Sequence, residues 1–113
     1  MTEADFAQRL QLTPGQLATL QGLLARHTPH AQAWAYGSRV TGGAHECSDL
    51  DLVLRRADDP SRRMEGLDTL REALRDSNLP ILVDVHDWAE LPASFRREIE
   101  RNHLELTVAS IAA

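Results

Sequence analysis

The segment from Asp49 to Arg55 restricts the fold of this chain more than any other sequence feature. Three leucines alternate there with two aspartates and a valine, in the order Asp49, Leu50, Asp51, Leu52, Val53 and Leu54. A period of two is the pattern of a β-strand, whose successive side chains point to opposite faces. The strand is therefore expected to lie in a sheet, with its leucines in the core and with Asp49 and Asp51 on the other face.

Helices and further strands alternate along the rest of the sequence. Strands are predicted at residues 31–36, 49–55 and 81–86, and a short one at 104–108. The predicted helices run from the capping box Thr13-Pro14-Gly15-Gln16 to Pro29, from the break at residues 58–61 to Asn78, and from Pro92 onward, with a shorter helix at 5–10. In the last helix, Leu91, Phe95 and Ile99 are expected to line one face.

This order of elements predicts an α/β (α+β) fold, in which helices pack on one face of a small mixed β-sheet. The other face is then expected to carry the polar residues. The sequence has 113 residues, which favours a single domain over residues 1–113.

The composition argues against several classes of protein. The net charge of -5 disfavours DNA or long RNA as the main partner, because proteins that bind a phosphate backbone are usually basic. No segment approaches the ~20 apolar residues of a membrane span, and residues 1–12 lack the apolar region of a signal peptide. A single cysteine cannot form an internal disulfide. We therefore expect a cytoplasmic protein.

Asp49 and Asp51 are the first candidates for a functional site. Two carboxylates on one face of a strand repel each other unless a cation lies between them, and Mg²⁺ binds through such carboxylates together with substrate phosphates. The alternative is the solvated face of an edge strand. Asp is an unfavourable strand residue, however, and two of them inside the clearest strand of the chain favour a functional site.

Asp84 interrupts the otherwise apolar strand Ile81-Leu82-Val83-Asp84-Val85. If this strand lies beside residues 49–55, a third carboxylate joins the other two, and three carboxylates suit a centre that binds two metal ions. The alternative is a buried Asp whose charge is satisfied by a helix N-terminus or an Arg. His86 lies two residues further and shares the face of Asp84, where it could contact a phosphate or an acceptor, or be an exposed histidine at a strand end.

Gly37 and Ser38 directly follow the predicted strand at 31–36. A glycine at this place allows the backbone to approach a ligand closely, and the Ser38 hydroxyl could hydrogen-bond a phosphate oxygen. Arg39 could neutralise a phosphate or be a solvated surface charge. An ordinary turn is the alternative for the whole segment.

Together these residues resemble the signature of the DNA polymerase β superfamily of nucleotidyltransferases. That signature is Gly-Ser, about ten residues, and then Asp-x-Asp or Asp-x-Glu; here Gly37-Ser38 is followed by residues 39–48 and Asp49-Leu50-Asp51. The sequence is most similar, over nearly its whole length, to the minimal nucleotidyltransferases (MNT), the antitoxins of MNT–HEPN toxin–antitoxin pairs. It departs from them at Thr41, where many relatives carry Arg or Lys.

The resemblance implies a polymerase-β-like nucleotidyltransferase fold and a role for each matching residue. Gly37 and Ser38, with Arg39, would bind the nucleoside triphosphate. Asp49 and Asp51 would bind two Mg²⁺ ions, and Asp84 would complete one metal site and help to deprotonate the acceptor hydroxyl.

The implied reaction is the transfer of AMP from ATP to a hydroxyl of a HEPN-family toxin, with tyrosine as the expected acceptor. The alternative is a non-catalytic nucleotide-binding module that neutralises the HEPN partner by complex formation. Either activity is compatible with a homo- or hetero-oligomer, and neither requires DNA or a membrane. The acceptor is expected to come from a partner because the sequence is short.

Overall fold

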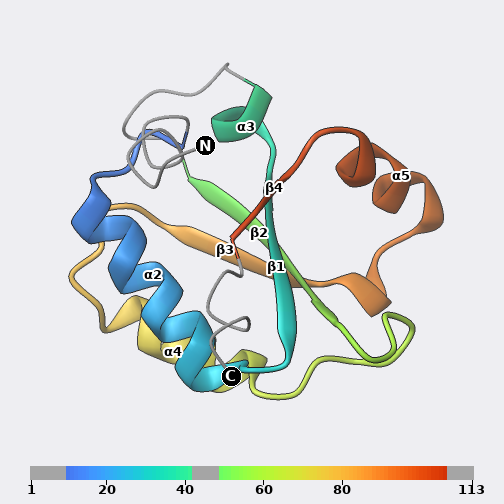
Figure 1. The fold of residues 1–113 in the computed structure, drawn as a ribbon, viewed down its shortest axis with the longest axis horizontal. Coiled ribbons are helices and arrows are strands. Elements are labelled where there is room, and N and C mark those ends of the chain that lie inside the picture. The colour runs from blue at the N-terminus through green and yellow to red at the C-terminus, as the bar shows by residue number, and fades with distance from the viewer. Residues whose placement is uncertain (1–9, 42–48, 107–113) are drawn as a thin grey trace.

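A computed structural model describes residues 10–41 and 49–106 of the chain. Its elements are α2 (Pro14–His27), β1 (Ala31–Tyr36), α3 (Ser38–Thr41), β2 (Leu50–Arg56), α4 (Leu67–Arg75), β3 (Val83–Asp87), the 3-10 turn η1 (Trp88–Glu90), α5 (Ala93–Arg101) and β4 (Leu104–Glu105) (Figure 1). The longest described helix, α2, has 14 residues, and none of the described helices is long and apolar enough to cross a membrane.

The four strands form one mixed sheet in the order β3-β2-β1-β4. β1 is antiparallel to both β2 and β4, whereas β2 is parallel to β3. A parallel pair needs a crossover connection, and α4 supplies it. The predicted α/β class and the mixed sheet are confirmed.

The main core lies between one face of the sheet and the helices α2 and α4. The three leucines of β2 are all fully buried there, as their alternation predicts; they are Leu50, Leu52 and Leu54. The predicted capping box at the start of α2 is present, with Gln16 N–H donating to the Thr13 hydroxyl at 3.1 Å and Thr13 N–H donating to Gln16 Oε1 at 2.9 Å. These bonds satisfy backbone donors that the first turn of a helix leaves open.

The opposite face of the sheet is only partly polar. Figure 1 shows α5 on the side of the sheet away from α2 and α4. It closes a second, smaller apolar cluster of Trp34, Val53, Trp88 and Ile99. The place of Val53 in this second cluster follows from the alternation in β2, because its side chain points away from the leucines. The carboxylates of this face lie at one end of it, where β1 ends and β2 and β3 begin, whereas Arg55 lies toward the other end, with its guanidinium over the rings of Trp34 and Trp88.

The structure corrects the predicted start of one helix. α4 begins at Leu67 rather than directly after residues 58–61, because residues 60–66 form turns that end at Gly66, whose φ of 85° is left-handed. On the predicted apolar face of α5, Ile99 is buried, whereas Phe95 is 43% exposed. The predicted helix at 5–10 lies almost wholly outside the described residues, and so does the end of the predicted strand at 104–108.

Candidate active site

Asp51 and Asp84 are direct partners across the parallel pair β2–β3. Both point to the face opposite the leucines, so neighbouring strands bring the two carboxylates together. Asp49 is exposed and directly precedes β2 on the same side of the alternation. The strands predicted at 49–55 and 81–86 are therefore adjacent in the sheet, as expected. Their register places carboxylates from two separate sequence motifs in one cluster.

The carboxylates of this cluster carry negative charge that they do not neutralise among themselves. Burial raises the pKa of Asp51 above its ordinary value of 3.8, and the charges of Asp84 and Asp49 raise it further, while His86 lowers it. His86 Nε2 lies 3.4 Å from Asp84 Oδ2. A carboxylate that is harder to ionise than usual because of burial and of neighbouring negative charge is a group that a cation would stabilise.

The donor atoms of this cluster fit a hard divalent cation. Carboxylate oxygens are the protein ligands that Mg²⁺ prefers, and it commonly binds through one or two of them together with substrate phosphates and water. Within residues 10–41 and 49–106, no group of three His, Cys, Asp or Glu side chains is arranged to hold a metal ion. The described cluster thus supplies two adjoining carboxylates and leaves further coordination to other oxygen ligands.

Gly37 lies against the Asp51 carboxylate. Its φ is 81°, and a Cβ added there would stand 2.6 Å from Asp51 Oδ2. Any other residue would therefore combine a strained left-handed backbone with a clash against the carboxylate. The turn leads at once into α3, with Val40 N–H donating to Gly37 carbonyl oxygen at 2.9 Å. Ser38 is the first residue of α3, and its side chain falls outside the described part of the chain.

Arg39 is buried beside the segment that precedes α2. Its side chain is buried, with 2% exposed, and Nη1 donates to the carbonyl oxygens of Leu10 at 2.6 Å and Gln11 at 3.2 Å. This guanidinium ties α3 to the segment before α2. The alternative of a solvated surface charge is wrong, because the side chain is buried and bonded to backbone oxygens. A contact between Arg39 and a nucleotide phosphate stays a prediction.

Tyr36 belongs to the cluster and was not singled out by its sequence context. It pairs with Asp51 across β1 and β2. Burial raises the pKa of its hydroxyl to about 12, with smaller contributions from the charges of Asp51 and Asp84. Phe95 meets its ring edge to face, with centroids 5.7 Å apart. Only the antiparallel register identifies Tyr36 as a neighbour of the carboxylates, since its place before Gly37 equally suits a core residue.

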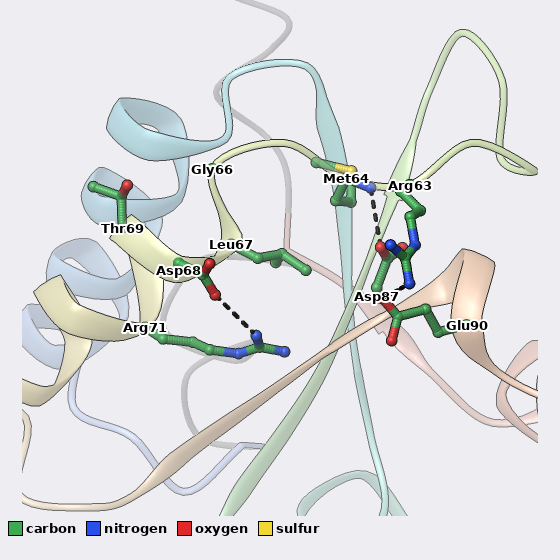
Figure 2. A pocket seen from close by; sticks show the side chains of 9 residues that line it. All are labelled: Arg63, Met64, Gly66, Leu67, Asp68, Thr69, Arg71, Asp87 and Glu90. Atoms are coloured by element: carbon green, nitrogen blue, oxygen red, sulfur yellow. Dashed lines mark hydrogen bonds and ion pairs between the residues drawn. The ribbon is translucent and has the colours of Figure 1, made fainter.

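A second polar region lies on the other face of β3 and contains none of the predicted site residues. A pocket of about 350 Å³ lies between the start of α4, the preceding loop and η1, and its lining side chains are drawn in Figure 2. Its charged side chains already have partners. Arg63 Nη2 lies 3.3 Å from Glu90 Oε1, and Arg71 Nη1 lies 3.6 Å from Asp68 Oδ1. Asp87 accepts a hydrogen bond from Met64 N–H. This pocket therefore offers little unsatisfied charge to a ligand.

Comparison with known proteins points to one family. Residues 18–109 match the family model described as polymerase beta, nucleotidyltransferase. The chain is 38% identical over 97 residues to a probable protein adenylyltransferase MntA of Haemophilus influenzae, which covers 86% of this chain and 82% of that protein. Its fold is similar to a crystal structure of a toxin–antitoxin with AMP-PNP, with a TM-score of 0.64 and 19% identity over 80% of this chain and 71% of that one.

Proposed function

The chain belongs to the polymerase β family of nucleotidyltransferases, and from this membership we propose that it transfers AMP from ATP to a hydroxyl group of a partner toxin and so acts as an antitoxin. The adenylyltransferase activity named for its relative supports the choice of AMP as the transferred group. The similarity of fold to a toxin–antitoxin supports the choice of a toxin as the partner.

The observation that carries the proposal is the pairing of Asp51 with Asp84, with Gly37 packed against Asp51. A strand register that sets two carboxylates face to face costs stability unless a cation joins them. Only glycine fits at position 37 beside the Asp51 carboxylate, and its lack of a side chain leaves the backbone open to a large ligand. Both features are expected of a site for a metal-bound triphosphate.

In this proposal Asp49, Asp51 and Asp84 would hold two Mg²⁺ ions together with oxygen ligands from the phosphates and from water. Bound there, the ions would neutralise the charge that develops on the phosphates during transfer. Gly37 and Ser38 position the triphosphate. Asp84 accepts the proton of the acceptor hydroxyl while the hydroxyl oxygen bonds to the α-phosphorus. The bond between that phosphorus and the oxygen that bridges it to the β-phosphorus breaks, and pyrophosphate leaves. The chain contributes mainly orientation and charge compensation.

The acceptor is proposed to be a tyrosine of a HEPN-family toxin. A phenolic hydroxyl ionises near a pKa of about 10, which is more easily reached than for an aliphatic hydroxyl. Removal of its proton by a carboxylate beside a cation is therefore a plausible route to the attacking oxygen. Attachment of AMP adds a bulky anionic group, and such a change can block the active surface of the toxin.

The test is a transfer assay with ATP labelled at the α-phosphate, Mg²⁺ and the copurified toxin. Label is expected on the toxin with the wild-type chain and is expected to disappear with Asp51→Asn. Asp76→Asn, an equivalent change at an exposed residue that ends α4, is the matched control and is expected to transfer normally. Neutralisation of the toxin without label, unaffected by Asp51→Asn, would instead support the non-catalytic binding module.

A further inference from the structure

Leu82 and Phe95 are exposed to an unusual degree for large apolar side chains. They are 62% and 43% exposed, while the other large apolar side chains of the described residues are mostly buried. Single exposed apolar residues are common on protein surfaces and need no explanation. These two, however, flank the same carboxylates, and apolar groups gathered around a polar site mark a surface that binds a partner.

Leu82 lies on the carboxylate face, immediately before β3. Its carbonyl oxygen accepts a hydrogen bond from Leu50 N–H at 2.9 Å, so the ladder of β2 and β3 already includes it. Its neighbours Ile81 and Val83 pack on the main core. Alternation then directs Leu82 to the same face as Asp84, two residues further along the strand.

Phe95 lies at the other side of the carboxylates. On α5 it precedes the buried Ile99 by one turn, so the apolar stripe of the helix continues past the smaller core toward the site. Its ring meets that of Tyr36, which in turn lies 6.5 Å from the ring of His86. Because His86 follows Asp84 on the strand, Asp84 lies between Leu82 and the aromatic group that ends in Phe95.

The apolar and aromatic groups on the two sides of Asp84 extend over more than the width of one small ring. Residues 82 and 86 bracket Asp84 on an extended segment, and four steps along a strand span about 13 Å. A nucleobase could cover one side of this opening, whereas a folded or extended protein segment could cover both. The acidic centre between the two sides favours a segment that brings a neutral or basic group rather than another carboxylate.

We propose that Leu82 and Phe95 form an apolar rim that binds the acceptor protein on both sides of the residue to be modified. The side chain that carries the acceptor hydroxyl enters between them, toward Asp51 and Asp84, while apolar neighbours of that residue contact the rim. This inference rests on the proposed function, because it assumes that the acceptor belongs to another protein. Beyond the proposed function, it names Leu82 and Phe95 as the residues that select the acceptor protein. It also predicts that the selected segment of that protein is apolar.

The experiment measures two affinities for each variant. The dissociation constant of the complex with the HEPN toxin is measured without nucleotide, and the KM for ATP is measured in the transfer assay. Leu82→Ala and Phe95→Ala are each expected to weaken the complex by about three- to tenfold, and the double variant by roughly the product, because each removes one apolar contact. The KM for ATP is expected to stay within about twofold in all of them.

Two further variants test the chemistry of the rim. Phe95→Leu keeps an apolar side chain and is expected to bind the toxin nearly as well as the wild type. Ser94→Ala, an exposed neighbour on α5, is expected to change neither affinity. If Phe95→Ala proves too unstable to measure, Leu82→Ala and Leu82→Ser decide the question, since Leu82 is mostly exposed and contributes little to the core.

The possible outcomes separate the rim from the reaction. A higher KM for ATP with an unchanged complex would assign Phe95 to the nucleobase and overturn the proposal, as would unchanged values of both quantities. If the wild-type complex forms but no label is transferred, the proposed reaction fails while the rim is still judged by the dissociation constants. Weaker complexes with normal use of ATP support the rim.

Discussion

Asp84 and Asp87 lie on the same short strand, yet their surroundings are opposite. Asp87 is 6% exposed, and its two oxygens accept hydrogen bonds from Met64 N–H at 3.0 Å and Ala89 N–H at 3.1 Å. The Asp84 side chain is 57% exposed and faces Asp51 across the strand pair. One carboxylate has backbone donors for both oxygens, and the other has a second carboxylate as its neighbour.

This difference separates an acid that supports the fold from one that is available to a ligand. Asp87 joins the loop before α4 to the start of η1, and the nearby charged groups are already paired (Figure 2). A carboxylate is stable in a buried position only when donors such as these backbone N–H groups bond its oxygens. Asp84 and Asp51 add a repulsion that His86 relieves only in part, because the pKa of Asp51 is still raised. Such a repulsion is expected where a cation is to bind.

The largest expected effect of changing one of these carboxylates is on catalysis. Asp51→Asn removes a proposed metal ligand and is expected to lower the rate of AMP transfer by roughly a hundredfold to a thousandfold, as loss of a group that stabilises transferring charge commonly does. Asp87→Asn is expected to leave the rate per folded molecule within about threefold. Equal losses in the two variants, measured with labelled ATP, would contradict the division of roles.

The next largest effect concerns stability. Asp87→Ala removes the acceptor for two backbone donors and is expected to lower the free energy of unfolding by about 2–4 kcal/mol. Urea denaturation followed by circular dichroism measures this change. Asp76→Ala serves as the control at an exposed carboxylate and is expected to change the free energy by less than about 0.5 kcal/mol. A similar value for both variants would show that the Met64 and Ala89 contacts do not matter.

Gly37→Ala is expected to combine a smaller loss of stability with a loss of transfer. The left-handed φ of 81° costs a residue with a Cβ about 1–2 kcal/mol, and the added methyl group would displace the Asp51 carboxylate. Thermal unfolding and the transfer assay together measure the two effects. The control is Gly22→Ala on α2, where nothing lies within 4 Å of an added Cβ and where Ala favours the helix. Normal transfer by Gly37→Ala would contradict the close approach.

The smallest effect is on the pH dependence of stability. Because the folded chain raises the pKa of Asp51 above 3.8, its ionisation favours the unfolded chain. This destabilisation is absent below pH 3.8, develops as the pH rises through the raised value, and is complete above it. Asp51→Asn is therefore expected to have a slightly higher Tm than the wild type at pH 7, without Mg²⁺, and the difference is expected to shrink toward pH 4. A lower Tm for the variant at pH 7 would contradict this sign.

The site was predictable where local pattern and spacing carry the information. The alternation over 49–54 was sufficient to direct Asp51 and the leucines to opposite faces. Gly37 was predictable as a place of close approach, because only glycine tolerates such a turn. The roles of the predicted site residues in binding metal and nucleotide stay predictions; these residues are Asp49, Asp51, Asp84, Gly37, Ser38 and Arg39.

Arg39 and Phe95 show where local pattern was insufficient. A basic residue after a glycine turn looks the same in sequence whether it faces a phosphate or a backbone carbonyl, and Arg39 bonds the carbonyl oxygens of Leu10 and Gln11. The helical period correctly directs Phe95 toward the sheet side of α5, but the period cannot tell where the sheet ends. Burial depends on what lies opposite a residue, and that partner comes from a distant part of the chain.

The sequence by itself determined which residues share a face, since side-chain direction follows from the backbone repeat of a strand or helix. It also determined the start of α2, where the capping residues lie within one turn of each other. Only the tertiary structure decided that Asp84 lies opposite Asp51, that Tyr36 flanks them, and that Asp87 is satisfied rather than available. Strand order and register depend on contacts between distant segments, and these follow from the packing of the whole sheet rather than from any local repeat.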